Sequence, residues 1–236
     1  MKETLRTNLI PLYKELLEKN ILEKGIYTFC MQWGKQFPKE EKSGILFVGK
    51  ATNGWVSDNR DIEILFGEVT ENKIFERADQ MKWIRNLENN TKGYNTRKSA
   101  FWRIIKKVAE YKNGKNDWFD KIAWSNLYKL SFEKGNPNEK LKRNQIEICK
   151  KILETEINIL NPKYVIFLTS NWEKDFINYL TLNKDRKNTK SLNWGKNYKT
   201  YGFTVDNLNY IISVHPQGKN EREHFKRIDE IMKHLG

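Results

Sequence analysis

The stretch ILFVGKATNGW, residues 45–55, is an apolar run that ends in glycine, lysine and a group of small polar residues. A short, almost wholly apolar run is typical of a central strand that is covered on both faces. The loop after it is glycine-rich, but it matches neither the phosphate-binding loop G-x-x-x-x-G-K-[ST] nor the dinucleotide-binding signature G-x-G-x-x-G. An ATPase and a dehydrogenase are therefore disfavoured.

Three similar apolar runs follow at 122–130, 164–170 and 209–218. The segments between and after them have apolar residues at helical spacing, and Ser99 is placed to cap the helix that follows it. Strands that alternate with helices predict an α/β fold with a parallel sheet and helices on both faces.

The ends of the chain and two insertions complete the expected domain. Residues 12–20 and 25–37 have helical spacing, so we expect a helical N-terminal extension over 1–40 that packs on a single domain spanning 1–236. We expect irregular insertions over 50–96 and 183–202. The second is basic and aromatic, which suits a loop near a nucleic acid and equally suits a surface excursion.

The formal charge of +13 favours a polyanionic partner, with nucleic acid first, because lysine and arginine near phosphates release condensed counterions. The alternative is that these charges are merely spread over a solvated surface. No apolar run approaches the roughly 20 residues that cross a bilayer, and the N-terminus lacks the apolar core of a signal peptide. We therefore expect a cytoplasmic protein without membrane contact.

Cysteine and histidine usage argues against a metal or disulfide framework. Cys30 and Cys149 have no CxxC partner, and both are expected to be core residues. The three histidines are scattered and do not form a metal-ligand pattern. We expect no metal and no cofactor.

Ligands bind beyond the carboxyl ends of parallel strands, which selects loops at Gly49, Asn126, Ser170 and His215. The Asn126 amide can donate and accept at once, which suits the edge of a nucleobase. His215 leaves a buried strand and is followed by a proline that fixes the turn. Either residue alone is more often structural than functional, but their combination at strand ends points to a site.

Four segments in this order resemble the uracil-DNA glycosylase superfamily: VGKATNG, WSNLYKLSFEKGNP, CKKILETEINILNPKYVIFLTS and ISVHPQG. They correspond to its first motif G-x-x-P-G, its asparagine-bearing strand, a helix followed by an apolar strand, and its closing H-P-[small] motif, over roughly 44–232. The last two are most similar to the branch whose other members carry an iron-sulfur cluster, whose cysteines this chain lacks. The resemblance implies a three-layer α/β/α sandwich with a four-stranded parallel sheet and a base-flipping pocket at its carboxyl edge.

The resemblance also implies roles for individual residues. Gly49 matches the turn glycine and Asn126 the base-reading asparagine. His215 matches the histidine that hydrogen-bonds the base and stabilises the anionic leaving group. The residues that would contact the DNA backbone are Lys129, Pro216, Gln217, Gly218 and Lys219.

The first motif departs from the family pattern. Thr52 and Asn53 replace its proline and glycine, Lys50 stands where one branch has glutamate, and Ala51 replaces the residue that positions water. Alanine cannot orient or deprotonate water. Asn53, if the loop is re-registered, or Asp58, the nearest carboxylate, would then take that role.

Two further features concern how DNA is held. Phe66 and Trp55 are the candidates for the aromatic floor on which a base stacks. The closing segment HPQGKNER has no apolar wedge to replace a flipped base. This favours single-stranded or distorted DNA as substrate, or a wedge from another loop.

Three functions follow from these observations. The first is a monofunctional DNA glycosylase, expected to be a monomer, that excises uracil or another modified base by hydrolysing the N-glycosidic bond. The second is a base- or nucleic-acid-binding module that kept the fold and lost the chemistry. The third is a pocket for a free nucleotide or another small molecule. Which base is bound, and whether RNA competes with DNA, stays open at this level.

Overall fold

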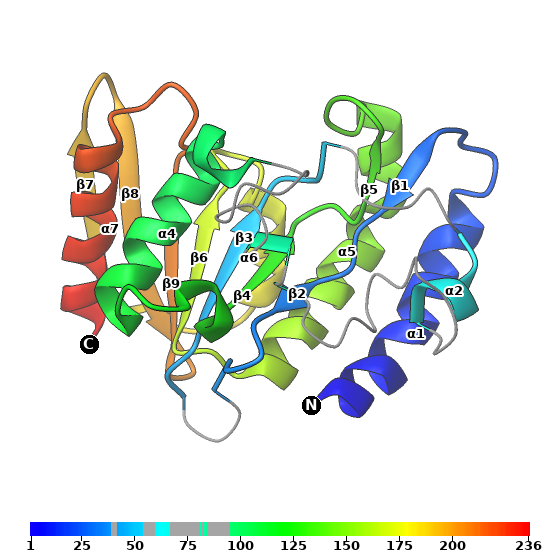
Figure 1. Cartoon of the computed structure of the whole chain (residues 1–236), viewed down its shortest axis with the longest axis horizontal. Coiled ribbons are helices and arrows are strands. Elements are labelled where there is room, and N and C mark those ends of the chain that lie inside the picture. The colour runs from blue at the N-terminus through cyan, green and yellow to red at the C-terminus, as the bar shows by residue number, and fades with distance from the viewer. Residues whose placement is uncertain (39–41, 54–59, 67–80, 82, 85–94) are drawn as a thin grey trace.

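The structure, a computed structural model, describes residues 1–38, 42–53, 60–66, 81, 83–84 and 95–236 (Figure 1). Its helical elements, including two 3-10 turns, are α1 (Lys2–Lys19), α2 (Ile62–Phe66), η1 (Thr96–Lys98), α4 (Ala100–Asn113), η2 (Trp118–Lys121), α5 (Glu139–Leu160), α6 (Lys174–Leu180) and α7 (Glu221–Leu235). Its strands are β1 (Ile26–Thr28), β2 (Gln32–Trp33), β3 (Ile45–Gly49), β4 (Ile122–Asn126), β5 (Leu130–Phe132), β6 (Tyr164–Leu168), β7 (Lys187–Trp194), β8 (Tyr198–Val205) and β9 (Leu208–Ser213).

The main sheet has seven strands in the order β2-β4-β3-β6-β9-β8-β7. Its centre consists of β4, β3, β6 and β9, which are mutually parallel and correspond to the four apolar runs in the sequence. The predicted α/β class with parallel strands is confirmed. The predicted size of four strands is wrong for this sheet, because β2, β8 and β7 extend it with antiparallel pairs.

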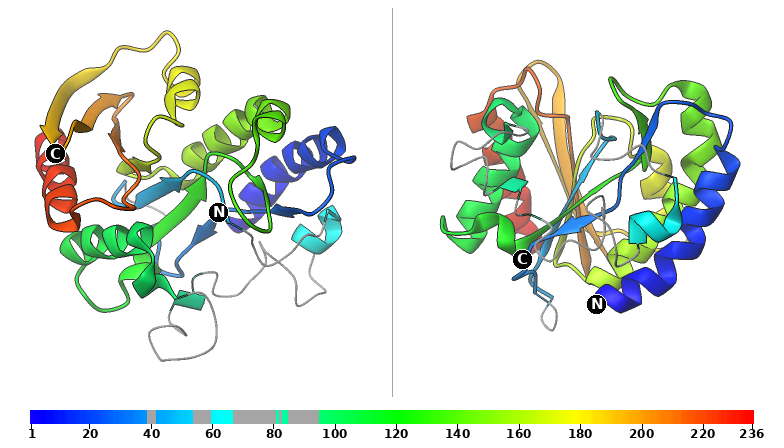
Figure 2. Two further views of the ribbon diagram at one scale, coloured as in Figure 1. Left: turned by 90° about the horizontal axis from the view of Figure 1, so that it is seen from above. Right: turned by 45° about the vertical axis from the view of Figure 1, so that its right-hand side comes forward.

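Helices cover both faces of this sheet (Figure 2). Because side chains alternate along a strand, Leu46 and Val48 of β3 pack with α1, α5 and α6, whereas Ile45 and Phe47 pack with α4 and α7. Every residue of β3 is buried, as expected for a central strand that has helices on both sides. The carboxyl ends of the parallel strands therefore lie between two helical layers.

The N-terminal extension is helical only in its first part. α1 packs against α5, but the helix predicted over 25–37 is wrong. β1 pairs antiparallel with β5, and β2 pairs antiparallel with β4 at the edge of the main sheet. The apolar residues in this segment have helical spacing, yet pairing with a neighbouring strand satisfies the backbone and buries them just as well.

The insertion over 183–202 was predicted to be irregular, and this prediction is also wrong. It contains β7 and the start of β8, which form an antiparallel hairpin at the far edge of the sheet. Most side chains of β7 are exposed, so this edge strand has no apolar run to reveal it. Most of the other predicted insertion, 50–96, lies outside the described residues.

The structure also bears on the predicted helix cap, the two cysteines, and the membrane and metal predictions. Ser99 caps α4 as predicted, since its hydroxyl accepts a hydrogen bond from the Trp102 N–H at 3.4 Å. Cys30 and Cys149 are buried free thiols. Of the described helices, none is long and apolar enough to cross a membrane. The described His, Cys, Asp and Glu side chains form no group of three that could hold a metal ion.

Candidate functional site

The loops after the four parallel strands meet at one edge of the sheet. Gly49 and Asn126 are direct partners in the ladder between β3 and β4. Backbone pairing continues past the strand ends, because the Leu127 N–H donates to the Gly49 carbonyl at 2.9 Å. The loops after β6 and β9 are joined by the His215 N–H, which donates to the Ser170 hydroxyl at 2.9 Å. Gly49 and Asn126 are thus held by backbone pairing, and His215 is held by the Ser170 side chain.

Asn126 is the central polar group at this edge. Its side chain is buried, with 1% of its surface exposed, and its Nδ2 has no hydrogen-bond partner within the described part of the chain. A buried donor left unpaired costs about 1–3 kcal/mol, so the fold retains an amide that a ligand oxygen could satisfy. Asn126 therefore makes this edge a candidate binding site.

Gly49 permits the close approach of backbone and amide. A Cβ at this position would collide with the Asn126 Oδ1 and would lie 3.1 Å from the Phe101 ring. Only glycine leaves this space empty. The turn glycine predicted from the sequence is thus explained by its neighbours.

The aromatic ring beside this glycine comes from α4 and was missed by sequence reasoning. Phe101 is half-buried, and its ring lies nearly parallel to that of His215, with an interplanar angle of 12° and centroids 6.2 Å apart. In the sequence, Phe101 forms part of an amphipathic helical pattern and looks like a core residue. No local signal distinguishes it, because only the packing of α4 against the sheet edge exposes the ring to the site.

The predicted aromatic floor is therefore corrected. Phe66 is buried in the core and packs edge-on against Tyr13, with centroids 5.1 Å apart. Its ring supports α1 and cannot present a free face to a base. The other candidate, Trp55, lies outside the described residues, as does Asp58.

His215 is a neutral ring at neutral pH. Burial, and then the positive charges of Lys50 and Lys219, lower its pKa to about 4. The Gln217 N–H donates to its Nδ1 at 3.4 Å, which leaves the ring proton on Nε2. A neutral imidazole with an Nε2–H can donate a hydrogen bond to an oxygen that gains negative charge.

The loop after His215 presents backbone and one cation to solvent. Gln217 and Gly218 are exposed, and Gly218 has a φ of 72°, which favours glycine. The Lys219 ammonium donates to the Gln217 carbonyl at 3.0 Å and lies 4.7 Å from the Tyr198 ring centroid. Pro216 is buried in this loop, and its predicted contact with a DNA backbone stays a prediction.

Lys129 is also misassigned by the sequence reasoning. Its ammonium is wholly buried and donates to the Ser125 hydroxyl at 2.6 Å, the Asn126 carbonyl at 2.8 Å and the Glu156 carboxylate at 2.9 Å. A cation enclosed in this way cannot reach a phosphate. Lys129 instead ties the end of β4 to α5.

The altered first motif is attached to β5 and the turn after it. Thr52 is buried, and its hydroxyl is 2.8 Å from that of Ser131. Asn53 is exposed, and its Oδ1 accepts a hydrogen bond from the Gly135 N–H. Ala51 packs partly against the core, while Lys50 points its ammonium at Trp172.

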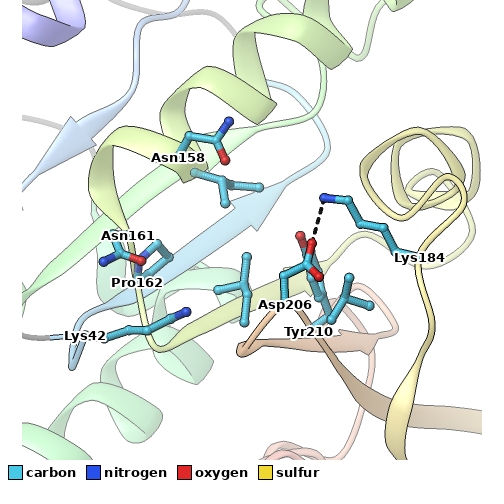
Figure 3. A pocket seen from close by; sticks show the side chains of 10 residues that line it. Lys42, Asn158, Asn161, Pro162, Lys184, Asp206 and Tyr210 are labelled. Atoms are coloured by element: carbon cyan, nitrogen blue, oxygen red, sulfur yellow. Dashed lines mark ion pairs between the residues drawn. The ribbon is translucent and has the colours of Figure 1, made fainter.

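A hollow lies at the opposite edge, where β6 and β9 begin (Figure 3). It has a volume of about 160 Å³, and Lys184 and Asp206 at its rim pair with each other at 3.0 Å. Of the described residues that line it, none has a buried polar side-chain atom without a partner. The carboxyl edge therefore carries the stronger sign of a ligand.

Comparison with known proteins does not assign either site. No family model matches this chain, and no curated protein matches it significantly. The function has to be inferred from the groups gathered at the carboxyl edge.

Proposed function

We propose that this chain binds a nucleobase of DNA at the carboxyl edge of its sheet and cleaves the N-glycosidic bond of that base. The proposal extends the resemblance of its four motifs to the uracil-DNA glycosylase superfamily. The observation that carries it is the buried Asn126 amide, whose Nδ2 has no partner in the described chain, next to a glycine that leaves its side free.

The groups at this edge suit the recognition of a uracil-like base. The Asn126 amide can donate to a carbonyl oxygen and accept from the adjacent ring N–H, and uracil offers both on one edge. The Phe101 ring offers a face for stacking, which contributes about 1–3 kcal/mol per base. The net charge of +13 suits a polyanion, and the polar loop after His215 suits single-stranded or distorted DNA.

The reaction would use His215 as an electrophilic group. As the N-glycosidic bond breaks, its electron pair moves to the base and positive charge develops on the sugar. The His215 Nε2–H would donate to the base oxygen that gains negative charge, and the low pKa keeps the ring neutral for this purpose. Water then attacks the anomeric carbon and loses a proton, which the base anion takes up, so the products are a free base and an abasic site.

The water in this reaction would be positioned by Asn53 or Asp58, and the closing loop with Lys219 would hold phosphate. The proposal includes a cytoplasmic monomer that needs neither metal nor cofactor.

A second candidate function is base binding without cleavage. It is favoured by Ala51, which stands where the resembled family places a water-positioning group. It is also favoured by the charges that act on His215, which among the described residues are the cations Lys50 and Lys219. A protonated lysine cannot act as a general base toward water.

The test uses single-stranded oligonucleotides that carry uracil or other modified bases, followed by alkaline cleavage of abasic sites. His215→Ala should lower the single-turnover rate about 100- to 1,000-fold, because it removes the donor to the leaving group. His234→Ala is the matched control, since His234 is exposed at the end of α7, and it should not change the rate.

Strand breaks that persist unchanged in His215→Ala would contradict the assigned chemistry. Intact strands whose binding depends on Asn126 would establish the second candidate function. If the protein neither binds nor cleaves any of these strands, both candidate functions are wrong.

A further inference from the structure

Two ammonium groups converge on one indole ring at the carboxyl edge. The Nζ of Lys142 lies 3.8 Å from the Trp172 ring centroid, and the Nζ of Lys50 lies 5.0 Å from it. Tyr128 packs edge-on against the same ring, with centroids 5.8 Å apart. The four residues come from the loops after β3, β4 and β6 and from the first turn of α5, so the tertiary fold assembles this cluster.

This arrangement concentrates positive charge. Burial, and then the charge of Lys142, lower the pKa of Lys50, and Lys219 of the loop after β9 acts in the same direction. Like charges held together repel, and a bound anion would relieve this repulsion.

Nearby carboxylates offset the positive charge only in part. Lys142 pairs with Glu139 at 2.7 Å, but the Glu139 side chain is 76% exposed, and solvent screens such a pair. Glu173 is buried and accepts from the Thr169 hydroxyl at 2.5 Å, and its charge raises the pKa of Lys50 against the larger effects of burial and Lys142. The cluster therefore retains the capacity to hold an anion.

Lys50 joins this cluster to the candidate base site. It follows Gly49 directly, and its charge lowers the pKa of His215. Because side chains alternate along an extended chain, Gly49 faces Phe101 of α4, whereas Lys50 faces Trp172 on the α5 side. The Tyr128 N–H donates to the Lys50 carbonyl at 3.0 Å, which keeps this alternation in register beyond the strand end.

We propose that Trp172, Lys142 and Lys50 form a subsite for the nucleotide adjacent to the one whose base meets Asn126. The phosphate lies between the two ammonium groups, and the neighbouring base packs against the indole. This inference rests on the proposed function for the position of the first base. It adds the path of the strand, which crosses the carboxyl edge from the α4 side to the α5 side.

The chain offers a matched control for this subsite. Lys142 and Lys150 both lie on α5, about two turns apart. Each pairs with a glutamate three residues earlier at 2.7 Å, and their side chains are 18% and 14% exposed. They differ in that Lys142 lies against Trp172.

The experiment measures the affinity of a fluorescent, uracil-containing single strand at a series of salt concentrations. Lys142→Ala should reduce the magnitude of the slope of log affinity against log salt by about 0.7, because one phosphate contact is lost. Trp172→Ala should weaken binding about tenfold, whereas Trp172→Phe should keep most of it. Lys150→Ala should match the wild type, and circular dichroism checks that each variant is folded.

The subsite is wrong if folded Lys142→Ala and Trp172→Ala bind with the affinity and salt slope of Lys150→Ala. It is also wrong if free deoxyuridine monophosphate binds as tightly as the strand. If the wild type excises the base and both Lys142→Ala and Trp172→Ala bind normally, the proposed function is supported and the subsite is wrong. A third outcome is binding that depends on Trp172 and Lys142, without excision and without an effect of Asn126→Ala. This outcome would contradict the proposed function but support a strand-binding surface at Trp172.

Discussion

Asn126 is the last residue of β4, and Lys129 follows three residues later, directly before β5. Both side chains are buried, but only one of them has its hydrogen-bond donors paired. The Lys129 ammonium donates to three acceptors at 2.6–2.9 Å. The Asn126 Nδ2 has no partner in the described chain. A buried polar group with a complete set of partners secures a fold, whereas one without them carries an energetic cost that a ligand can offset.

The two residues are also connected. One acceptor of Lys129 is the backbone carbonyl of Asn126, and another is Glu156 on α5. The Lys129 ammonium therefore holds the backbone from which the Asn126 amide projects. A rigid support of this kind is what precise recognition of a ligand needs.

The largest effect on stability is expected from removing the Lys129 ammonium. Lys129→Ala should lower the free energy of unfolding by about 3–5 kcal/mol, because it leaves the Glu156 carboxylate buried without a cation. Urea denaturation measures this change. Lys129→Met combined with Glu156→Leu should recover most of the loss, and Lys150→Ala should change the stability little. Equal stabilities of Lys129→Ala and Lys150→Ala would show that the network does not support the fold.

The buried His224 ring gives a smaller, pH-dependent effect. The His224 ring bonds the Ser213 hydroxyl at 2.7 Å, and Thr200 bonds the same hydroxyl at 2.7 Å. Burial, and then the charges of His215 and Lys219, lower the pKa of His224 to about 4. The unfolded chain takes up this proton near pH 6.5 and the folded chain only near pH 4, so acid stabilises the unfolded state in this window.

The contribution of His224 to stability is therefore complete above about pH 6.5 and is lost as the pH falls toward 4. Between about pH 7.5 and pH 5 it should fall by about 2 kcal/mol, measured by urea denaturation at each pH. His224→Gln should show a pH dependence flatter by this amount. An unchanged pH dependence in His224→Gln would mean that the folded and unfolded chains take up this proton at the same pH.

The smallest effect on stability is expected at the open site. Asn126→Ala removes the unpartnered donor, so the free energy of unfolding should change by less than about 1 kcal/mol. Discrimination between uracil-containing and undamaged strands should nevertheless fall at least about tenfold. Urea denaturation and competition binding measure the two quantities. If Asn126→Ala strongly destabilises the protein and leaves discrimination unchanged, Asn126 supports the fold, as Lys129 does, and does not bind the base.

The centre of the fold and its edges differ in how far they could be predicted. β3, β4, β6 and β9 are buried on both faces, so each appears in the sequence as an apolar run. β7 pairs on one side only and exposes most of its side chains, so nothing in its composition distinguishes it from a loop. β1 and β2 were mistaken for helix because long-range pairing overrode a local spacing of apolar residues.

The residues of the candidate site also divide into those that the sequence predicts and those that it does not. Gly49, Asn126 and His215 were selected because the carboxyl ends of parallel strands share one edge, and the structure brings them together there. Phe101 was missed because its spacing is that of a core residue, and Phe66 was chosen although its ring is enclosed by the core.

The sequence by itself determined the alternation of strands and helices, the basic charge and the strand-end residues, since these depend on local patterns of hydrophobicity and on composition. Only the tertiary structure decided which buried lysine is paired, which aromatic ring faces the site and which cations meet at Trp172. Those outcomes depend on which residues distant in the sequence come within contact distance, and no local pattern encodes that.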